Sequence, residues 1–144
     1  IFYQKLMIDF VGLASVCLVT LSVIFISYLN PIVAKFFLVG FIIRLSLLFV
    51  GYFIELPDSS ADAETFEVLA WYQSQKGFFG TLSDFQGPHA RFISWLIAVP
   101  YSLFGRSLLM AQSISLVFGM GSILLGWALA KRIWNIEIAN KVAW

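Results

Sequence analysis

The stretch FVGLASVCLVTLSVIFISYLNPIVA, residues 10 to 34, decides the fold because it contains no charged side chain. An α-helix rises about 1.5 Å per residue, so roughly 20 apolar residues cross the hydrocarbon layer of a membrane. We therefore expect one transmembrane helix here, ending near the turn at Asn30 and Pro31. Cys17 lies within this run, where we expect it to be a buried small hydrophobic residue.

The composition of the whole chain supports a membrane protein. Its 144 residues are 60% hydrophobic and 12% charged, whereas soluble domains are about 45 to 50% apolar and about 25% charged. Such a chain has too little polar surface to cover a soluble core. Nine Lys and Arg against eight Asp and Glu leave a net charge of +1, which provides no broad basic surface, so we exclude nucleic acid as a partner.

Three further uncharged or nearly uncharged runs predict more membrane helices. Residues 36–54 form the second, with Arg44 near its centre, and residues 107–130 form the last. Residues 92–105 are short for a span, but Arg91 and Arg106 can extend outward from its two ends. An arginine inside a span normally faces protein, water or an anion. We therefore expect Arg44 either to pair with helices outside this chain or to lie near an anionic lipid carrier.

These runs predict an all-α, polytopic membrane protein with about four transmembrane helices and one juxtamembrane helix. Residues 1–54 hold two spans, 55–91 form an acidic loop, and 92–144 hold two further spans and the start of the next segment. Because the chain begins at Ile1 and stops just after a fresh apolar stretch, we expect it to be the N-terminal fragment of a longer protein.

The acidic loop carries the candidate chemistry. A helix-start pattern around Ser59 and Asp62 precedes an apolar periodic run, which predicts an amphipathic helix on the membrane interface. We expect this helix to bury Phe66, Leu69, Ala70 and Tyr72. Asp62, Phe66 and Ala70 share one face of that helix because they are four residues apart. Spacing alone also allows Asp62 to act as a helix cap with Ser59.

Other catalytic arrangements have weak support. His89 is the one histidine, so a site built on several histidines is excluded, and no nucleophile, Walker or dinucleotide-binding motif occurs. We expect no metal site and no certain cofactor. Asp58 and Asp62 could share a divalent cation through their oxygens, but two acids four residues apart are insufficient alone.

The order of these residues resembles the first extracytoplasmic loop of the GT-C glycosyltransferases, which include the aminoarabinose transferases and protein O-mannosyltransferases. In that family an Asp opens a juxtamembrane helix, with an aromatic residue four positions later and an alanine eight later, as at Asp62. Trp95 and the pair Phe104-Gly105 keep the register of a second motif, which places His89 where the family has a lysine. The stretch Ala128-Leu129-Ala130-Lys131-Arg132 is similar to the family's helix exit.

The resemblance implies transfer of a sugar from a polyprenyl-phosphate donor to a hydroxyl of a glycan, lipid or protein acceptor. Asp62 would be the general base that takes the hydroxyl proton. His89 and Arg91 would stabilise the leaving phosphate, with Phe66 and Asp58 also at the substrate. The fragment alone is expected to be inactive.

Two arguments disagree about the side of the membrane on which the acidic loop lies. The count of basic residues places the acidic loop in the cytoplasm, whereas the family places residues 55–91 outside, at an inner (plasma) membrane, and we follow the family.

Two other readings of the function stay open. The chain could belong to a transporter or scaffold with a merely solvated loop, or to a polysaccharide ligase or polymerase. Separately, Arg91 could simply reach a lipid head group at the start of a short helix, with His89 a turn residue.

Overall fold

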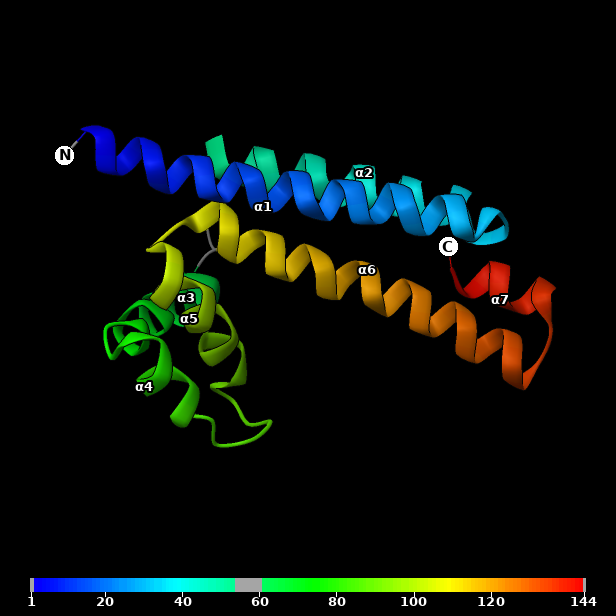
Figure 1. Ribbon diagram of the computed structural model, residues 1–144. Coiled ribbons are helices and arrows are strands. Elements are labelled where there is room, and N and C mark those ends of the chain that lie inside the picture. The colour runs from blue at the N-terminus through cyan, green and yellow to red at the C-terminus, as the bar shows by residue number, and fades with distance from the viewer. Residues whose placement is uncertain (1, 54–60, 144) are drawn as a thin grey trace. The chain divides into compact units, whose positions relative to one another are not determined.

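The computed structural model describes residues 2–53 and 61–143, with side chains for residues 10–52 and 62–143. Every regular element in these ranges is an α-helix (Figure 1). In chain order they are α1 (Phe2–Leu29), α2 (Pro31–Phe53), α3 (Ala61–Ser74), α4 (Gly77–Ser83), α5 (Phe92–Phe104), α6 (Leu108–Ile133) and α7 (Ile136–Val142). The all-α prediction is therefore confirmed for the described residues.

Three of these helices are long and apolar enough to cross a membrane. They span Phe10–Leu29, Pro31–Tyr52 and Leu108–Ile133, which matches three of the four predicted segments and indicates an integral membrane protein. The break between the first two lies at Asn30, as expected. The fourth segment, α5, has 13 residues, which is about 20 Å of helix against a hydrocarbon core of about 30 Å.

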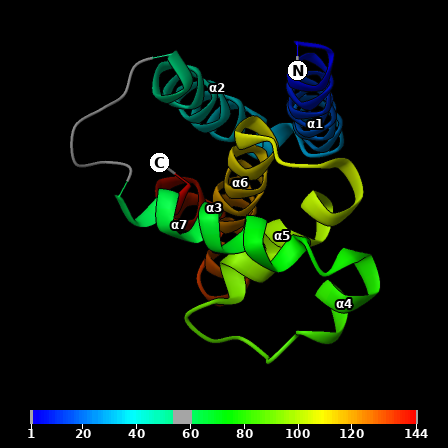
Figure 2. The same cartoon turned by 90° about the vertical axis from the view of Figure 1, so that its left-hand side faces the viewer.

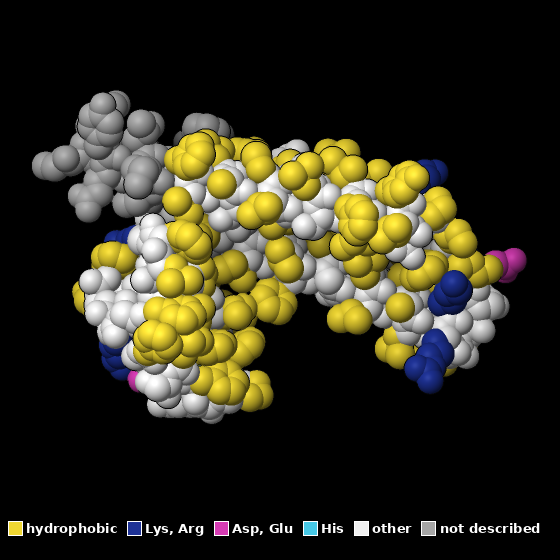
Figure 3. Space-filling view, in the orientation of Figure 1, with side chains coloured by type: hydrophobic (Ala, Val, Ile, Leu, Met, Phe, Trp, Pro, Cys, Tyr) yellow, Lys and Arg dark blue, Asp and Glu magenta, His cyan; other side chains and the backbone are white. Residues whose placement is uncertain are grey.

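The long helices expose the apolar side chains that a lipid environment requires. Phe25 on α1 is 62% exposed and Leu125 on α6 is 73% exposed, and hydrophobic side chains cover much of the visible face in Figure 3. Cys17 is also exposed on α1. The prediction that Cys17 is buried is therefore wrong, because a small apolar side chain can face lipid as well as a protein core.

The chain divides into two compact units, residues 1–14 with 54–111 and residues 15–53 with 112–144. The second unit is organised by α2 and α6. A Cβ added at Gly40 would lie 3.0 Å from Ile123, and one added at Gly119 would lie 2.6 Å from Arg44. These contacts progress in opposite directions along the two helices, so α2 and α6 are antiparallel. Their far ends meet α7 in one apolar cluster, made of Val33, Trp127, Ala130, Ala139 and Ala143.

The first unit contains α3, α4 and α5, which lie together in Figure 2. Glu67 on α3 is hydrogen-bonded to Tyr101 near the C-terminal end of α5. Thr81 on α4 links Gln73 near the end of α3 to Trp95 near the N-terminal end of α5. Helices α3 and α5 therefore run antiparallel and contact each other along the length of α5.

A helix, α3, is present where the juxtamembrane helix was predicted, but the face that it buries within the protein differs from the expected one. Ala70 is fully buried, as expected, and Phe66 and Leu69 are half-buried, whereas Tyr72 is 69% exposed and Glu67 is only 6% exposed. The apolar pattern alone misassigned this face because Glu67 has a polar partner on α5, Tyr101, and a charged partner just after α5, Arg106. The short helix α4 was not predicted.

Candidate functional site

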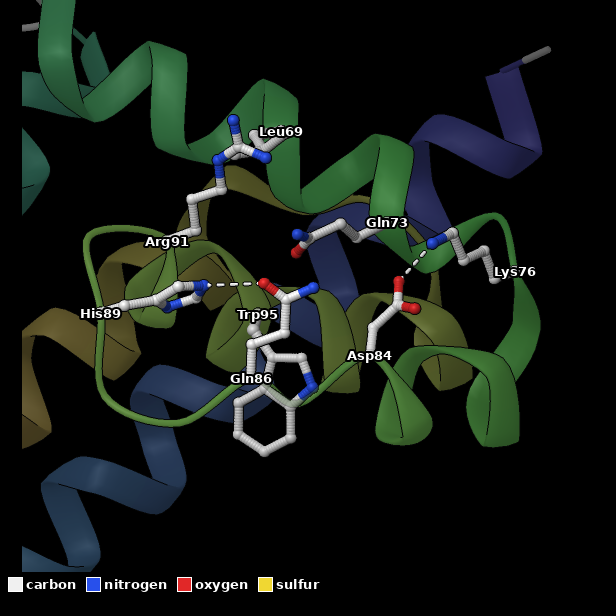
Figure 4. Close-up of a pocket in the computed structure, with 8 residues that line it drawn as sticks. All are labelled: Leu69, Gln73, Lys76, Asp84, Gln86, His89, Arg91 and Trp95. Carbon is white, nitrogen blue, oxygen red and sulfur yellow. Dashed lines mark hydrogen bonds and ion pairs between the residues drawn. The ribbon is translucent and has the colours of Figure 1, made fainter.

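A partly open pocket of about 250 Å³ lies between α3 and the segment that leads into α5. Its lining residues are predominantly polar, and Figure 4 shows them around one cavity. They are Leu69, Gln73, Lys76, Asp84, Gln86, His89, Arg91 and Trp95. The pocket therefore brings together His89 and Arg91, the two residues that the sequence analysis chose as phosphate ligands.

The charge of this pocket is positive on balance. Lys76 and Arg91 contribute two fixed positive charges, and Asp84 contributes one negative charge through an ion pair with Lys76. The Nε2 atom of His89 lies 3.3 Å from the Oε1 atom of Gln86. Since Arg91 is exposed, its guanidinium is open to a ligand. An anion is the complement of this arrangement.

One polar atom in the pocket lacks a partner among the described residues. The Oε1 atom of Gln73 is buried and accepts no hydrogen bond, and the Gln73 side chain points into the cavity in Figure 4. Buried polar atoms are nearly always hydrogen-bonded. A ligand that carries hydroxyl groups would supply the missing donor at this position.

Trp95 is the aromatic residue that lines the pocket, and two further rings pack against it. The indole nitrogen of Trp95 donates to the carbonyl oxygen of Thr81 at 2.8 Å, which fixes the orientation of the ring. Phe85 packs against Trp95 with ring centroids 4.6 Å apart, and Phe92 lies 6.0 Å from the same ring. The Trp95 ring is therefore held in place, and it offers an apolar surface next to the charged groups.

Asp62, the predicted base, does not line the pocket. It lies in the first turn of α3 and is exposed. Helical geometry places Asp62 on the same face as Leu69 and Gln73, because seven and eleven residues are close to two and three full turns. Leu69 is about 10 Å further along the helix axis. Phe66 is half-buried between them, and Asp58 lies outside the described residues.

A second polar cluster holds the first unit together. Both carboxylate oxygens of Glu67 accept from Arg106, at 2.9 Å from Nε and 2.6 Å from Nη2. The hydroxyl of Tyr101 also donates to Glu67, at 2.9 Å. Burial raises the pKa of Glu67, but the Arg106 and Tyr101 hydrogen bonds outweigh it and lower that pKa below its ordinary value of 4.5. Glu67 is thus an ionised structural carboxylate.

Sequence reasoning missed Gln73, Lys76 and Asp84 as pocket residues. A signal for Gln73 was present, since it continues the helical face of Asp62 and Phe66 for one more turn than the motif covers. Lys76 and Asp84 gave no comparable signal, because α4 lies between them and its presence was not expected. Local spacing does not show which residues a short helix brings together.

The described residues contain no group of three or more His, Cys, Asp and Glu side chains that could hold a metal ion. The pair Asp58 and Asp62 is not tested by this, since Asp58 lies outside the described part of the chain. No family model, characterised protein or solved structure in the comparisons matches this chain.

Proposed function

We propose that this chain is part of a membrane glycosyltransferase that takes a sugar from a polyprenyl-phosphate donor. The observation that carries the proposal is the pocket that Lys76 and Arg91 line together with Gln73, whose amide oxygen has no partner. A phosphate complements the cations, and a sugar hydroxyl complements the amide oxygen. Few ligands offer both groups on neighbouring atoms, and a sugar phosphate is one of them.

The size of the pocket agrees with a head group rather than a lipid chain. Its volume of about 250 Å³ is below the roughly 300 to 1,000 Å³ of pockets that enclose a whole drug-sized ligand. A polyprenyl chain would therefore stay outside, in the lipid beside the spans. Trp95 offers an apolar face to the sugar ring, as aromatic residues do in many polar pockets.

Asp62 is proposed as the general base for the acceptor hydroxyl. Arg91 is the pocket cation that reaches toward Leu69 on α3 (Figure 4), and Leu69 lies two helical turns from Asp62 on the same face. A phosphate held by Arg91 would leave about 10 Å along α3 for the sugar and the acceptor. The base would then be on the acceptor side of the sugar, and the cations on the leaving-group side.

We further propose that α5 does not cross the membrane, so that the chain has three spans rather than four. Helix α5 packs along its length on α3, which carries Asp62, Glu64 and Glu67. Arg106, just after α5, bonds directly to Glu67. If α5 crossed the bilayer, the acidic helix α3 would have to lie in the hydrocarbon with it, at high cost.

Three spans also remove the conflict over orientation. The acidic segment and the N-terminus would share one side with Lys5, Lys76, Arg91 and Arg106, and the other side would hold Lys35, Lys131, Arg132 and Lys141. Basic residues are then evenly divided, so the positive-inside rule no longer opposes an extracytoplasmic pocket. That side, at the plasma membrane, is the one we propose.

The test is binding of a short polyprenyl phosphate to the chain in lipid nanodiscs, with the corresponding alcohol as the matched ligand. The phosphate should bind and the alcohol should not. Arg91→Ala should weaken phosphate binding at least about tenfold, because it removes charge-assisted hydrogen bonds. Arg132→Ala removes an equal charge from the exposed last turn of α6 and should leave binding unchanged.

Equal binding of the phosphate and the alcohol would reject the pocket as a phosphate site. Equal weakening by Arg91→Ala and Arg132→Ala would mean that total charge, and not this pocket, attracts the ligand. A scaffold or transporter with a phosphate-binding loop is the second candidate, favoured by the position of Asp62 outside the pocket. It predicts the same binding result but no dependence of sugar transfer on Asp62.

A further inference from the structure

Arg44 lies deep in the second span, in a position where an arginine needs a partner. The span runs from Pro31 to Tyr52, so Arg44 is within about 4 Å of its middle. In a helix the Cα–Cβ bond tilts toward the N-terminus. The side chain of Arg44 therefore starts toward the far end of α2 and not toward the nearer end at Tyr52, which makes escape to the closer interface difficult.

The guanidinium of Arg44 lies over a glycine of α6. A Cβ added at Gly119 would lie 2.6 Å from Nη1 and 2.9 Å from Cζ of Arg44, so any larger residue at Gly119 would displace the charge. Gly119 is also central in its own span, Leu108–Ile133. The positions of Arg44 in α2 and of Gly119 in α6 therefore both place the positive charge near the middle of the membrane. Arg44 is exposed on the surface of this unit.

This chain cannot neutralise Arg44 from its own spans. Among the described residues no carboxylate is paired with Arg44; the ion pairs found there join Lys76 to Asp84 and Arg106 to Glu67. None of the eight Asp and Glu residues in the sequence falls within the three spans. A second copy of this chain brings the same three spans and so cannot provide the carboxylate either.

We propose that Arg44 is the docking point for a transmembrane helix of different sequence that carries an Asp or Glu at mid-membrane depth. The surface beside Arg44 suits a closely packed helix. Ser115, Gly119 and Ser122 share one face of α6, and the two serines are exposed. Small residues of this kind let helix backbones approach in membranes, and an acidic partner supplies the charge that Arg44 needs.

The experiment measures association of the full chain with synthetic transmembrane peptides in zwitterionic vesicles by fluorescence energy transfer. The peptides have Leu-Ala cores and differ only at the central residue, which is Glu, Gln or Leu. The Glu peptide should bind the chain about 3- to 20-fold more tightly than the Leu peptide. Arg44→Leu should remove that preference, and Arg132→Leu, at the end of α6, should keep it.

Equal binding of the Glu and Leu peptides to the unaltered chain would overturn the proposal without reliance on any variant. So would a preference that survives in Arg44→Leu. The pairing of Arg44→Glu with an Arg-centred peptide adds a reciprocal check, since restored binding requires direct contact of the two charges. If phosphatidylglycerol in the vesicles abolishes the preference, and mass spectrometry shows lipid retained only when Arg44 is present, the occupant is a lipid phosphate and the helix proposal fails.

Discussion

Arg106 binds both carboxylate oxygens of Glu67, at 2.9 and 2.6 Å, and so ties α3 to the residues between α5 and α6. Tyr101 adds a third hydrogen bond to the same carboxylate. Glu67 has a side chain only 8% exposed, whereas the Arg106 side chain remains 46% exposed. The pair is therefore a structural salt bridge at the edge of the first unit, with the Glu67 carboxylate on the buried side.

Replacement of Glu67 tests the contribution of this salt bridge to stability. Glu67→Ala should lower the free energy of unfolding of the α3–α5 packing by about 1 to 3 kcal/mol, because it removes the acceptor of the Arg106 guanidinium. It also leaves the buried Tyr101 hydroxyl with only the Ser107 carbonyl oxygen as its acceptor. Hydrogen exchange of α3 and α5 in detergent measures the effect. Glu64→Ala, an exposed acid on the same helix, should cause little change. Equal protection in both variants would show that the contact contributes nothing.

The same contact predicts a pH dependence. The pKa of Glu67 is lowered in the folded protein, so its ionisation stabilises the fold at all pH values above about 4.5. That contribution should be lost as the pH falls below this value and Glu67 takes up a proton. Protection of α3 and α5 should therefore decrease as the pH is lowered below about 4.5. In Glu67→Gln the decrease should be smaller, and an identical decrease would assign it to other carboxylates.

The proposed base has a matched control in the same helical turn. In an assay of the proposed sugar transfer, Asp62→Asn should reduce the rate by about 10² to 10⁴, because the acceptor hydroxyl would lose its proton acceptor. Glu64→Gln removes an equal charge from the first turn of α3 but on the opposite face, since two residues turn the helix by about 200°. A loss of activity common to both variants would indicate a helix-terminus effect rather than catalysis.

Cysteine labelling can count the spans. Ser83 and Glu137 are both exposed, and three spans place them on opposite sides of the membrane, whereas four spans place them on the same side. In a Cys17→Ser background, an impermeant thiol reagent applied to intact cells should label Ser83→Cys and not Glu137→Cys. Labelling of both would mean that α5 crosses the bilayer. Labelling of Glu137→Cys alone would keep three spans but place the pocket in the cytoplasm.

Charge-free runs predicted the long helices well, because the length of a span and the absence of charge are both set by the bilayer. The turn at Asn30 and Pro31 was equally visible. The face of α3 was harder to predict, since Glu67 is buried by partners that lie up to 39 residues away in sequence. A polar residue that belongs to a network has the same local pattern as one that faces water.

The candidate site shows the same limit. Arg91 and His89 were chosen from a short motif, and the structure places both in one pocket. Gln73 and Lys76 enter that pocket because α4 returns the chain to the end of α3, and no motif spans that return. Asp62 lies outside the pocket because two turns of α3 separate it from Leu69 at the pocket. The motif, which relates Asp62 only to residues four and eight positions later, does not reveal this separation.

Thr81 is fully buried at the point where three helices meet. Its hydroxyl lies 2.9 Å from the carbonyl oxygen of Gly77 and 3.1 Å from that of Gln73, and its own carbonyl accepts from Trp95. The walls that carry Gln73 and Trp95 are therefore held together before any ligand arrives. Binding would cost the ligand conformational entropy, but it would cost the protein little, because these walls are already ordered. Selectivity would therefore come from the fixed shape of the cavity.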